Sequence, residues 1–203
     1  MVTNRHGDSV DITLSSYETA AQRYAVHSAG ASPALSAFLD LFADTVGFGR
    51  VLEVGSGPGM DAAYLERRGL NVSRTDATPA FVEMMRAAGC EARLLDIRTS
   101  DLGGPWEAVL AQAVLLHLDR AQFADALQRI RQAVIDGGVL AFTVKEGDGD
   151  AWSEAKLDLP RHFTYWRERP LRHVLAQTRW AVMSIDRVAG RVEPWLFVMA
   201  RTA

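Results

Sequence analysis

The sequence predicts an α/β fold in which helices cover both faces of a doubly wound, mostly parallel sheet. Strand-like and helix-like segments alternate from residue 50 to about residue 145, and such alternation implies right-handed crossovers between parallel strands. The chain has 203 residues, of which 48% are hydrophobic, and this suits one globular domain. The pattern changes after residue 145 and predicts an antiparallel ending.

Each element of the alternating part is predicted from its own residues. Short runs of apolar and β-branched residues predict strands, and apolar residues three or four apart predict helices. In order, we expect a strand at Val51–Val54, a helix near Gly59–Arg68, a strand at Asn71–Thr75, a helix at Pro79–Ala88, strands at Cys90–Leu95 and Ala108–Ala113, an amphipathic helix at Arg120–Ile135 and a strand at Val139–Val144.

The last part of the chain begins with a polar, acidic loop. A helix is predicted at Arg167–Thr178, followed by strands at Val182–Val188 and Glu193–Ala200. The connection at Ala189-Gly190-Arg191 is so short that these two strands must pair antiparallel, because a parallel return needs a crossover of about a dozen residues or more.

A glycine-rich turn follows the first predicted strand, with Gly55, Gly57 and Gly59 at alternate positions. Glycine permits positive φ angles and a close backbone approach to a ligand. We expect Pro58 to lie in the first turn of the next helix, whose free N–H groups can face that ligand. The dinucleotide-binding pattern G-x-G-x-x-G does not fit, because position 60 is methionine.

This turn resembles the E-x-G-x-G-x-G motif of the class I S-adenosylmethionine-dependent methyltransferases, matched here by Glu53, Gly55, Gly57 and Gly59. The resemblance covers residues 35–145 well and the hairpin more loosely. It implies a Rossmann-like, seven-stranded sheet with strand order 3-2-1-4-5-7-6, S-adenosylmethionine as cofactor and S-adenosylhomocysteine as product. It further implies one domain over residues 1–203, with a helical lid at 1–34, a cofactor-binding core at 35–145 and a substrate loop, helix and hairpin at 146–203.

The ends of the second and third predicted strands supply residues for the adenosine part of the cofactor. In open α/β sheets an acid about 20 residues after the first glycine binds the ribose hydroxyls, and Asp76 has this position, with Ala77 beside the adenine. Alternatively, Asp76 caps the next helix, although Thr78 is better placed for that. The resemblance puts Asp96 and Ile97 around the adenine, and the alternative for Asp96 is a surface turn.

The resemblance also gives roles to residues near the methionine part of the cofactor. Ser56 belongs to the glycine loop, and Gln112 and Ala113, at the end of the fourth strand, would hold the methionine moiety through backbone carbonyls. Many relatives have Asn or Ser in place of Gln112. Glu53 would steady the loop and the methionine amino group, or else only bind the loop backbone, because a carboxylate buried in a strand must be paired.

Candidate catalytic residues lie outside this core. Tyr17 and Tyr24 have helical spacing and belong to a predicted lid over the cofactor, or to an amphipathic helix packed on the sheet. His117 follows the fourth strand, where the resembling family often has a histidine near the transferred methyl group. It can act as a base near neutral pH, or fix the loop before Asp119 caps the next helix.

A second candidate for acceptor binding is Arg161, in the alternating stretch Pro160–Trp166. If this stretch is extended, Arg161, Phe163 and Tyr165 share one side. An arginine beside aromatic rings suits an anionic or planar acceptor, because guanidinium groups bind carboxylates in bidentate fashion. The alternative is an ion pair between Arg161 and one acid of the acidic loop, which contains Asp148, Asp150 and Glu154.

Composition argues against several other classes of protein. The net charge of −3 and the lack of a Lys/Arg-rich run argue against a nucleic-acid substrate. Cys90 is the only cysteine and the histidines lack paired spacing, so no metal site is expected. No apolar run approaches the ~20 residues that span a membrane, and Met1–Asp8 lacks the apolar core of a secretion signal, so we expect a cytoplasmic protein.

The sequence therefore predicts a methyltransferase that uses S-adenosylmethionine to methylate an oxygen or nitrogen of a small, natural-product-like acceptor, such as a carboxylate or an aromatic compound. In such an in-line displacement the protein mainly positions the reactants and excludes water. We expect a monomer or a homodimer. Two alternatives remain open: an NAD(P)-dependent oxidoreductase, and a regulatory protein that binds S-adenosylmethionine without catalysis.

Overall fold

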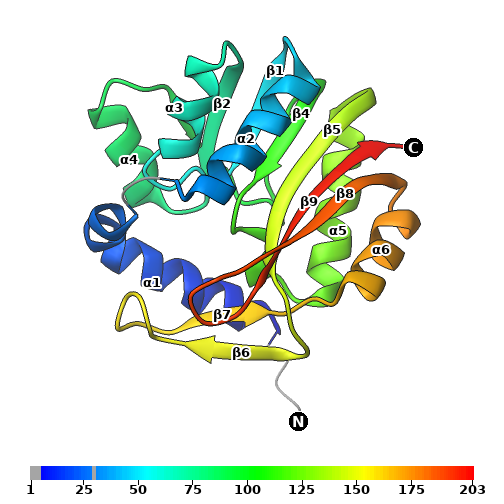
Figure 1. Cartoon of the computed structure of the whole chain (residues 1–203). Coiled ribbons are helices and arrows are strands. Elements are labelled where there is room, and N and C mark those ends of the chain that lie inside the picture. The colour runs from blue at the N-terminus through cyan, green and yellow to red at the C-terminus, as the bar shows by residue number, and fades with distance from the viewer. Residues whose placement is uncertain (1–5, 29–30) are drawn as a thin grey trace.

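The computed structural model describes residues 6–28 and 31–203. Its main sheet has seven strands in the order β3-β2-β1-β4-β5-β9-β8, and helices lie on both sides of it (Figure 1). The strands of this sheet are β1 (Arg50–Val54), β2 (Asn71–Asp76), β3 (Ala92–Leu94), β4 (Trp106–Ala111), β5 (Val134–Lys145), β8 (Trp180–Val188) and β9 (Trp195–Thr202).

The pairing of these strands confirms the predicted topology. Strands β3, β2, β1, β4 and β5 are parallel to one another, whereas β9 is antiparallel to both β5 and β8. Counted within this sheet, β8 and β9 are the sixth and seventh strands, so the order is the expected 3-2-1-4-5-7-6. Residues 189–194 make the short connection that forces the last pair to be antiparallel.

The helices alternate with the parallel strands as predicted. They are α1 (His6–His27), α2 (Pro33–Val46), α3 (Met60–Arg67), α4 (Pro79–Ala87), the short 3₁₀ helix η1 (Leu115–His117), α5 (Arg120–Ala133) and α6 (Glu168–Gln177). The Asp119 side chain accepts hydrogen bonds from the first turn of α5, so its predicted capping role is confirmed.

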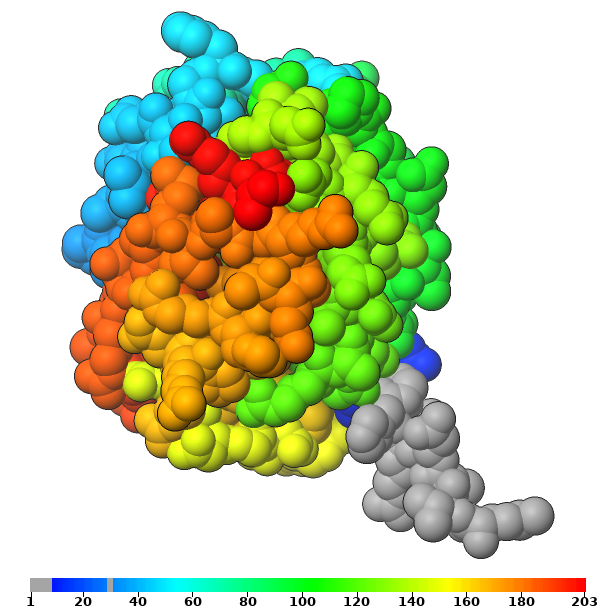
Figure 2. Space-filling model, turned by 90° about the vertical axis from the view of Figure 1, so that its right-hand side faces the viewer, coloured from blue at the N-terminus to red at the C-terminus, as the bar shows by residue number. Residues whose placement is uncertain are grey.

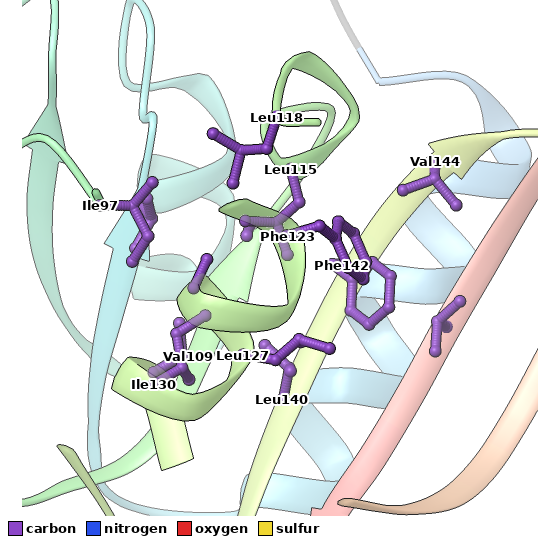
Figure 3. Packing of buried hydrophobic residues seen from close by; sticks show 14 of the residues in the cluster. Ile97, Val109, Leu115, Leu118, Phe123, Leu127, Ile130, Leu140, Phe142 and Val144 are labelled. Atoms are coloured by element: carbon purple, nitrogen blue, oxygen red, sulfur yellow. The ribbon is translucent and has the colours of Figure 1, made fainter. Parts of the chain in front are cut away.

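Side chains of the central strands are buried on both faces of the sheet. In β1, Leu52 and Val54 belong to the apolar cluster beneath α5 and α6, while Val51 belongs to the cluster beneath α2 and α3. Figure 3 shows Phe123 and Leu127 of α5 packed over β4 and β5. Burial on both faces explains why these strands appear in the sequence as continuous apolar runs.

A second, two-stranded sheet closes one end of the molecule. Its strands, β6 (Asp150–Ser153) and β7 (Arg161–Thr164), are antiparallel, and they lie with α1 below the main sheet in Figure 1. Figure 2 shows the adjoining face, where α6 (orange) lies beside α5 (green) and the β6–β7 segment (yellow) lies beneath. The predicted lid at residues 1–34 includes residues 1–5 and 29–30, which lie outside the described part of the chain.

Several boundaries differ from the prediction. The helix predicted at Arg120–Ile135 ends at Ala133, because the next residues already pair with β4 as the beginning of a longer β5. Helix α3 begins at Met60, so Pro58 lies in the preceding turn and not in the first helical turn. The β6–β7 sheet was predicted only as a loop with one alternating stretch, because all of β6 is at least partly exposed and lacks an apolar pattern.

Candidate functional site

A cavity of about 360 Å³ lies between α1 and the carboxyl ends of β1, β2 and β4. This is the crevice in which open α/β sheets bind ligands. Its wall contains most of the predicted site residues, from both the cofactor group and the acceptor group: Tyr17, Tyr24, Gly55, Ser56, Gly57, Asp76, Ala77, Asp96, Ile97, Gln112, Ala113 and His117. The structure therefore brings twelve predicted residues together, while Glu53, Gly59 and Arg161 lie outside the wall.

The glycine loop requires glycine for two different reasons. Gly55, Gly57 and Gly59 all have positive φ angles, of 69°, 53° and 84°, which residues with a side chain rarely adopt. At Gly55 there is also no space, because a Cβ atom would lie 2.3 Å from Cγ2 of Val114. Gly59 caps the beginning of α3 and its N–H donates to the Ser56 carbonyl at 2.8 Å. The loop is thus a tight backbone turn at the cavity wall.

Asp76, at the end of β2, holds this loop in place. Its Oδ2 accepts a hydrogen bond from the Gly57 N–H and its Oδ1 accepts one from the Thr78 N–H, both at 2.8 Å. Burial raises the pKa of Asp76, although these N–H donors favour the charged form. Neither Thr78 nor Asp76 caps the first turn of α4: the Thr78 side chain makes no capping hydrogen bond, and the Ala80 N–H donates to Glu18 of α1 at 2.9 Å. Each carboxylate oxygen still has lone-pair capacity toward the cavity.

Glu53 is buried in β1, with only 2% of its surface exposed. Its Oε2 is a buried acceptor without a hydrogen-bond partner in the described part of the structure. Burial raises the pKa of Glu53 to about 8, so the carboxyl group holds its proton at neutral pH in the absence of a cationic partner. A nearby cation would stabilise the charged form of this carboxyl group, whose Oε2 has no partner of its own.

Asp96 and Ile97 line the cavity after β3, but Asp96 already has a partner. Arg98 donates to both of its carboxylate oxygens at 2.7 and 3.0 Å, and also to Asp11 of α1 at 2.8 Å. Burial works against the negative charge of Asp96, but the Arg98 hydrogen bonds outweigh it and lower the pKa. The link between Arg98 and Asp11 was not predicted, because nothing in the local sequence brings α1 to this strand end.

The end of β4 forms the floor beneath the loop. Ala113 has an unusual positive φ of 53°, and its N–H donates to the buried Thr143 hydroxyl at 3.0 Å. This turn directs Gln112 and Ala113 into the cavity wall. Asp61, in the first turn of α3, also lines the wall, and burial raises its pKa to about 6. Asp61 was not among the predicted site residues, although acids in a first helical turn are a known signal.

Tyr17 and His117 meet at the other end of the cavity. The Tyr17 hydroxyl and His117 Nε2 are 3.0 Å apart, and His117 Nδ1 is 2.7 Å from the His162 carbonyl oxygen. Because a carbonyl only accepts, Nδ1 carries the proton and Nε2 accepts the proton of the Tyr17 hydroxyl. Burial lowers the pKa of His117 to about 4. His117 is therefore a neutral imidazole whose basic nitrogen is already covered by Tyr17.

Arg161, in β7, approaches the same tyrosine from outside the wall. Its Nη1 lies 3.4 Å from the Tyr17 hydroxyl oxygen, and its guanidinium lies over the rings of Tyr17 and Phe163. Two of the three acids offered as alternative partners are paired elsewhere: Asp148 with Arg167 and Asp150 with His162. None of the three lies within ion-pair distance of Arg161, so that alternative is wrong. Tyr24 contacts the Tyr17 ring edge-on, with centroids 5.3 Å apart.

Comparisons with known proteins identify the family of this chain. Sheet order and cavity position define the class I methyltransferase fold. Residues 27–185 match the family model described as "Methyltransferase domain". The chain belongs to this family, whose class uses S-adenosylmethionine, and the predicted resemblance is confirmed. A search of curated proteins gave no match.

Solved structures with the same fold include enzymes of different kinds. One is 1,6-didemethyltoxoflavin-N1-methyltransferase of Burkholderia thailandensis, with bound 1,6-didemethyltoxoflavin and S-adenosylhomocysteine (18% identity, TM-score 0.79, 98% of this chain and 90% of that chain covered). Another is the DhpI-SAM-HEP complex (23% identity, TM-score 0.77, 95% of this chain and 97% of that chain covered). A third is the [4+2]-cyclase SpnF (14% identity, TM-score 0.75, 96% of this chain and 96% of that chain covered). The fold alone does not determine the reaction.

Within residues 6–28 and 31–203, no helix has both the length and the apolar character that a bilayer crossing requires. The same residues contain no cluster of three or more histidine, cysteine or acidic side chains arranged to bind a metal ion.

Proposed function

We propose that this protein transfers a methyl group from S-adenosylmethionine to an oxygen or nitrogen of a small acceptor, with carboxylates and aromatic compounds as the first candidates. The observation that carries the proposal is the single cavity that joins the glycine loop to Tyr17 and His117. One part of its wall has the groups expected for the cofactor. The rest of the wall has aromatic and polar groups, and its described residues contain no metal-binding cluster.

The residues of the first part fit S-adenosylmethionine. Asp76 would bind the ribose hydroxyls, and Ala77 and Ile97 would lie beside the adenine. Glu53 lies outside the cavity wall, so it would stabilise the amino group through the glycine loop or a water molecule. Gln112 and Ala113 would hold the methionine part. When bound, S-adenosylmethionine supplies an electrophilic methyl group on a positively charged sulfur.

The protein's own groups would position the acceptor and keep water out. Helix α1 would act as the lid, since Glu18 accepts the Ala80 N–H at 2.9 Å and Ser16 donates to the Pro160 carbonyl at 2.7 Å. Tyr17 would hydrogen-bond the acceptor, and a proton that it received could pass to His117 Nε2. The low pKa of His117 suits brief acceptance of a proton better than its storage.

Calorimetry and a methyl-transfer assay test this function. The protein should bind S-adenosylmethionine and S-adenosylhomocysteine but not NADH, and it should methylate a member of a panel of carboxylates, phenols and amines, detected by mass spectrometry. Binding of NADH alone would favour the oxidoreductase. Binding of S-adenosylmethionine without methyl transfer to any tested acceptor would favour a regulatory protein.

A further inference from the structure

Arg161 is a buried cation without an anionic partner. Only 7% of its surface is exposed, and in the described part of the chain no carboxylate lies within 4 Å of its guanidinium. Its Nε is buried and makes no hydrogen bond. The contact with the Tyr17 hydroxyl is 3.4 Å long, beyond the usual range for a strong hydrogen bond, so most of the five N–H donors remain available.

A second cation, Lys156, comes from the loop between β6 and β7 and lines the cavity, whereas Arg161 lies outside the cavity wall, beside Tyr17. The Lys156 Nζ lies 3.9 Å from the centroid of the Tyr24 ring and 3.0 Å from the Ser28 hydroxyl. Burial and the charge of Arg161 both lower the pKa of Lys156. Lys156 was not among the predicted site residues, because a lone lysine in an acidic loop carries no signal.

Each of these cations contacts a tyrosine ring, and the two rings contact each other. Arg161 lies 5.7 Å from the Tyr17 centroid, Tyr17 and Tyr24 are 5.3 Å apart at 84°, and Lys156 lies over Tyr24. Cation–π contacts offset only part of the cost of burying a guanidinium, and a buried cation normally has an anionic partner. Arg161 has no such partner among the described residues, and its guanidinium lies over the rings of Tyr17 and Phe163.

We propose that Arg161 and Lys156 form a subsite for an oxyanion carried by the methyl acceptor, a carboxylate or a phosphorus oxyanion, whose carbon skeleton contacts Tyr17 and Tyr24. The inference rests on the proposed function, since it names the substrate class of the same cavity. The planar guanidinium supplies paired donors and the lysine supplies a point charge, so both would stabilise an oxyanion bound beside the two tyrosine rings.

Calorimetry on the protein saturated with S-adenosylhomocysteine tests the subsite with matched probes. Benzoate and phenylphosphonate should each bind at least about tenfold more tightly than neutral benzamide, which has a similar shape. Arg161→Met and Lys156→Met should each remove about tenfold or more of the anion affinity while benzamide affinity changes little. Arg172→Met, an equivalent change on the exposed surface of α6, should leave anion binding as in the wild type. The better of the two anions identifies the chemistry.

The outcomes separate the two proposals. If the protein does not bind S-adenosylhomocysteine at all, the proposed function fails. If it binds S-adenosylhomocysteine but neither anion better than benzamide, the subsite is wrong and the methyltransferase proposal stands. If Arg161→Met does not fold, Arg161→Lys and Lys156→Met decide: wild-type benzoate affinity in both variants overturns the subsite, and a loss of affinity in both supports it.

Discussion

Replacement of Asp76 by alanine separates the two roles that the structure gives this carboxylate. Asp76→Ala removes two hydrogen bonds of 2.8 Å, from the Gly57 and Thr78 N–H groups, at a site that is 6% exposed. A hydrogen bond to a charged group contributes about 1.5–3 kcal/mol. Water from the cavity can reach the freed N–H groups, so we take the low end, and the unfolding free energy should fall by about 3 kcal/mol.

The variant should nevertheless remain folded, because domains of this kind have a stability of about 5–15 kcal/mol. At about 2–4 °C per kcal/mol for a chain of this size, the melting temperature should fall by roughly 6–12 °C. If Asp76 also binds the ribose, two further charge-assisted hydrogen bonds are lost and the affinity for S-adenosylhomocysteine should fall about 100-fold or more.

Scanning calorimetry measures the first effect and titration calorimetry on the folded variant measures the second. Asp125→Ala, the same change at an exposed position on α5, should alter neither value. A lower melting temperature with wild-type affinity would leave Asp76 as a loop-holding residue and refute ribose binding. An unchanged melting temperature would refute the hydrogen-bond reasoning itself.

Three further predictions follow from pKa shifts and packing. Burial raises the pKa of Glu53 from 4.5 in the unfolded chain to about 8, so the folded state binds the proton more tightly. The free energy of unfolding therefore falls as the pH rises from 4.5 to 8. Glu53→Gln should abolish this fall, measured by urea denaturation without cofactor. S-adenosylhomocysteine should also release up to about one proton from Glu53 at pH 7, seen by calorimetry in two buffers. His117, with a pKa of about 4, should remain neutral from pH 5 to 8 with its proton on Nδ1, and an NMR titration midpoint near 6.5 would contradict this. Gly55→Ala should cost more than ~2 kcal/mol, because its Cβ meets Val114 at 2.3 Å. Gly89 also has a positive φ, of 83° against 69° at Gly55, but has open space, so Gly89→Ala should cost only about 1 kcal/mol. Equal losses would show that φ strain alone matters.

The glycine loop and the acid that holds it could be predicted, because each depends on residues that are close together in the sequence. Gly55 and Gly57 are needed for backbone geometry within one turn, and Asp76 follows from the length of one strand–helix–strand unit. The antiparallel ending also followed from a local fact, the short connection after Val188. Pro58 was placed wrongly, because whether a turn precedes the helix depends on packing that one proline does not encode.

The acceptor end could not be predicted in the same way. Tyr17 and Arg161 were singled out for their residue types, but only the fold brings them together, from α1 and from a β7 strand that follows the main parallel part of the chain. Lys156 and the link from Arg98 to Asp11 had no sequence signal at all.

The sequence by itself determined the class of fold, the glycine loop and the acid that holds it, since period, turn chemistry and strand spacing are properties of neighbouring residues. Only the tertiary structure decided that His117 is a neutral, covered imidazole and that Arg161 lacks an anion. The reason is physical: burial, pKa and pairing depend on which distant side chains share a cavity, and these contacts form only when the whole chain has folded.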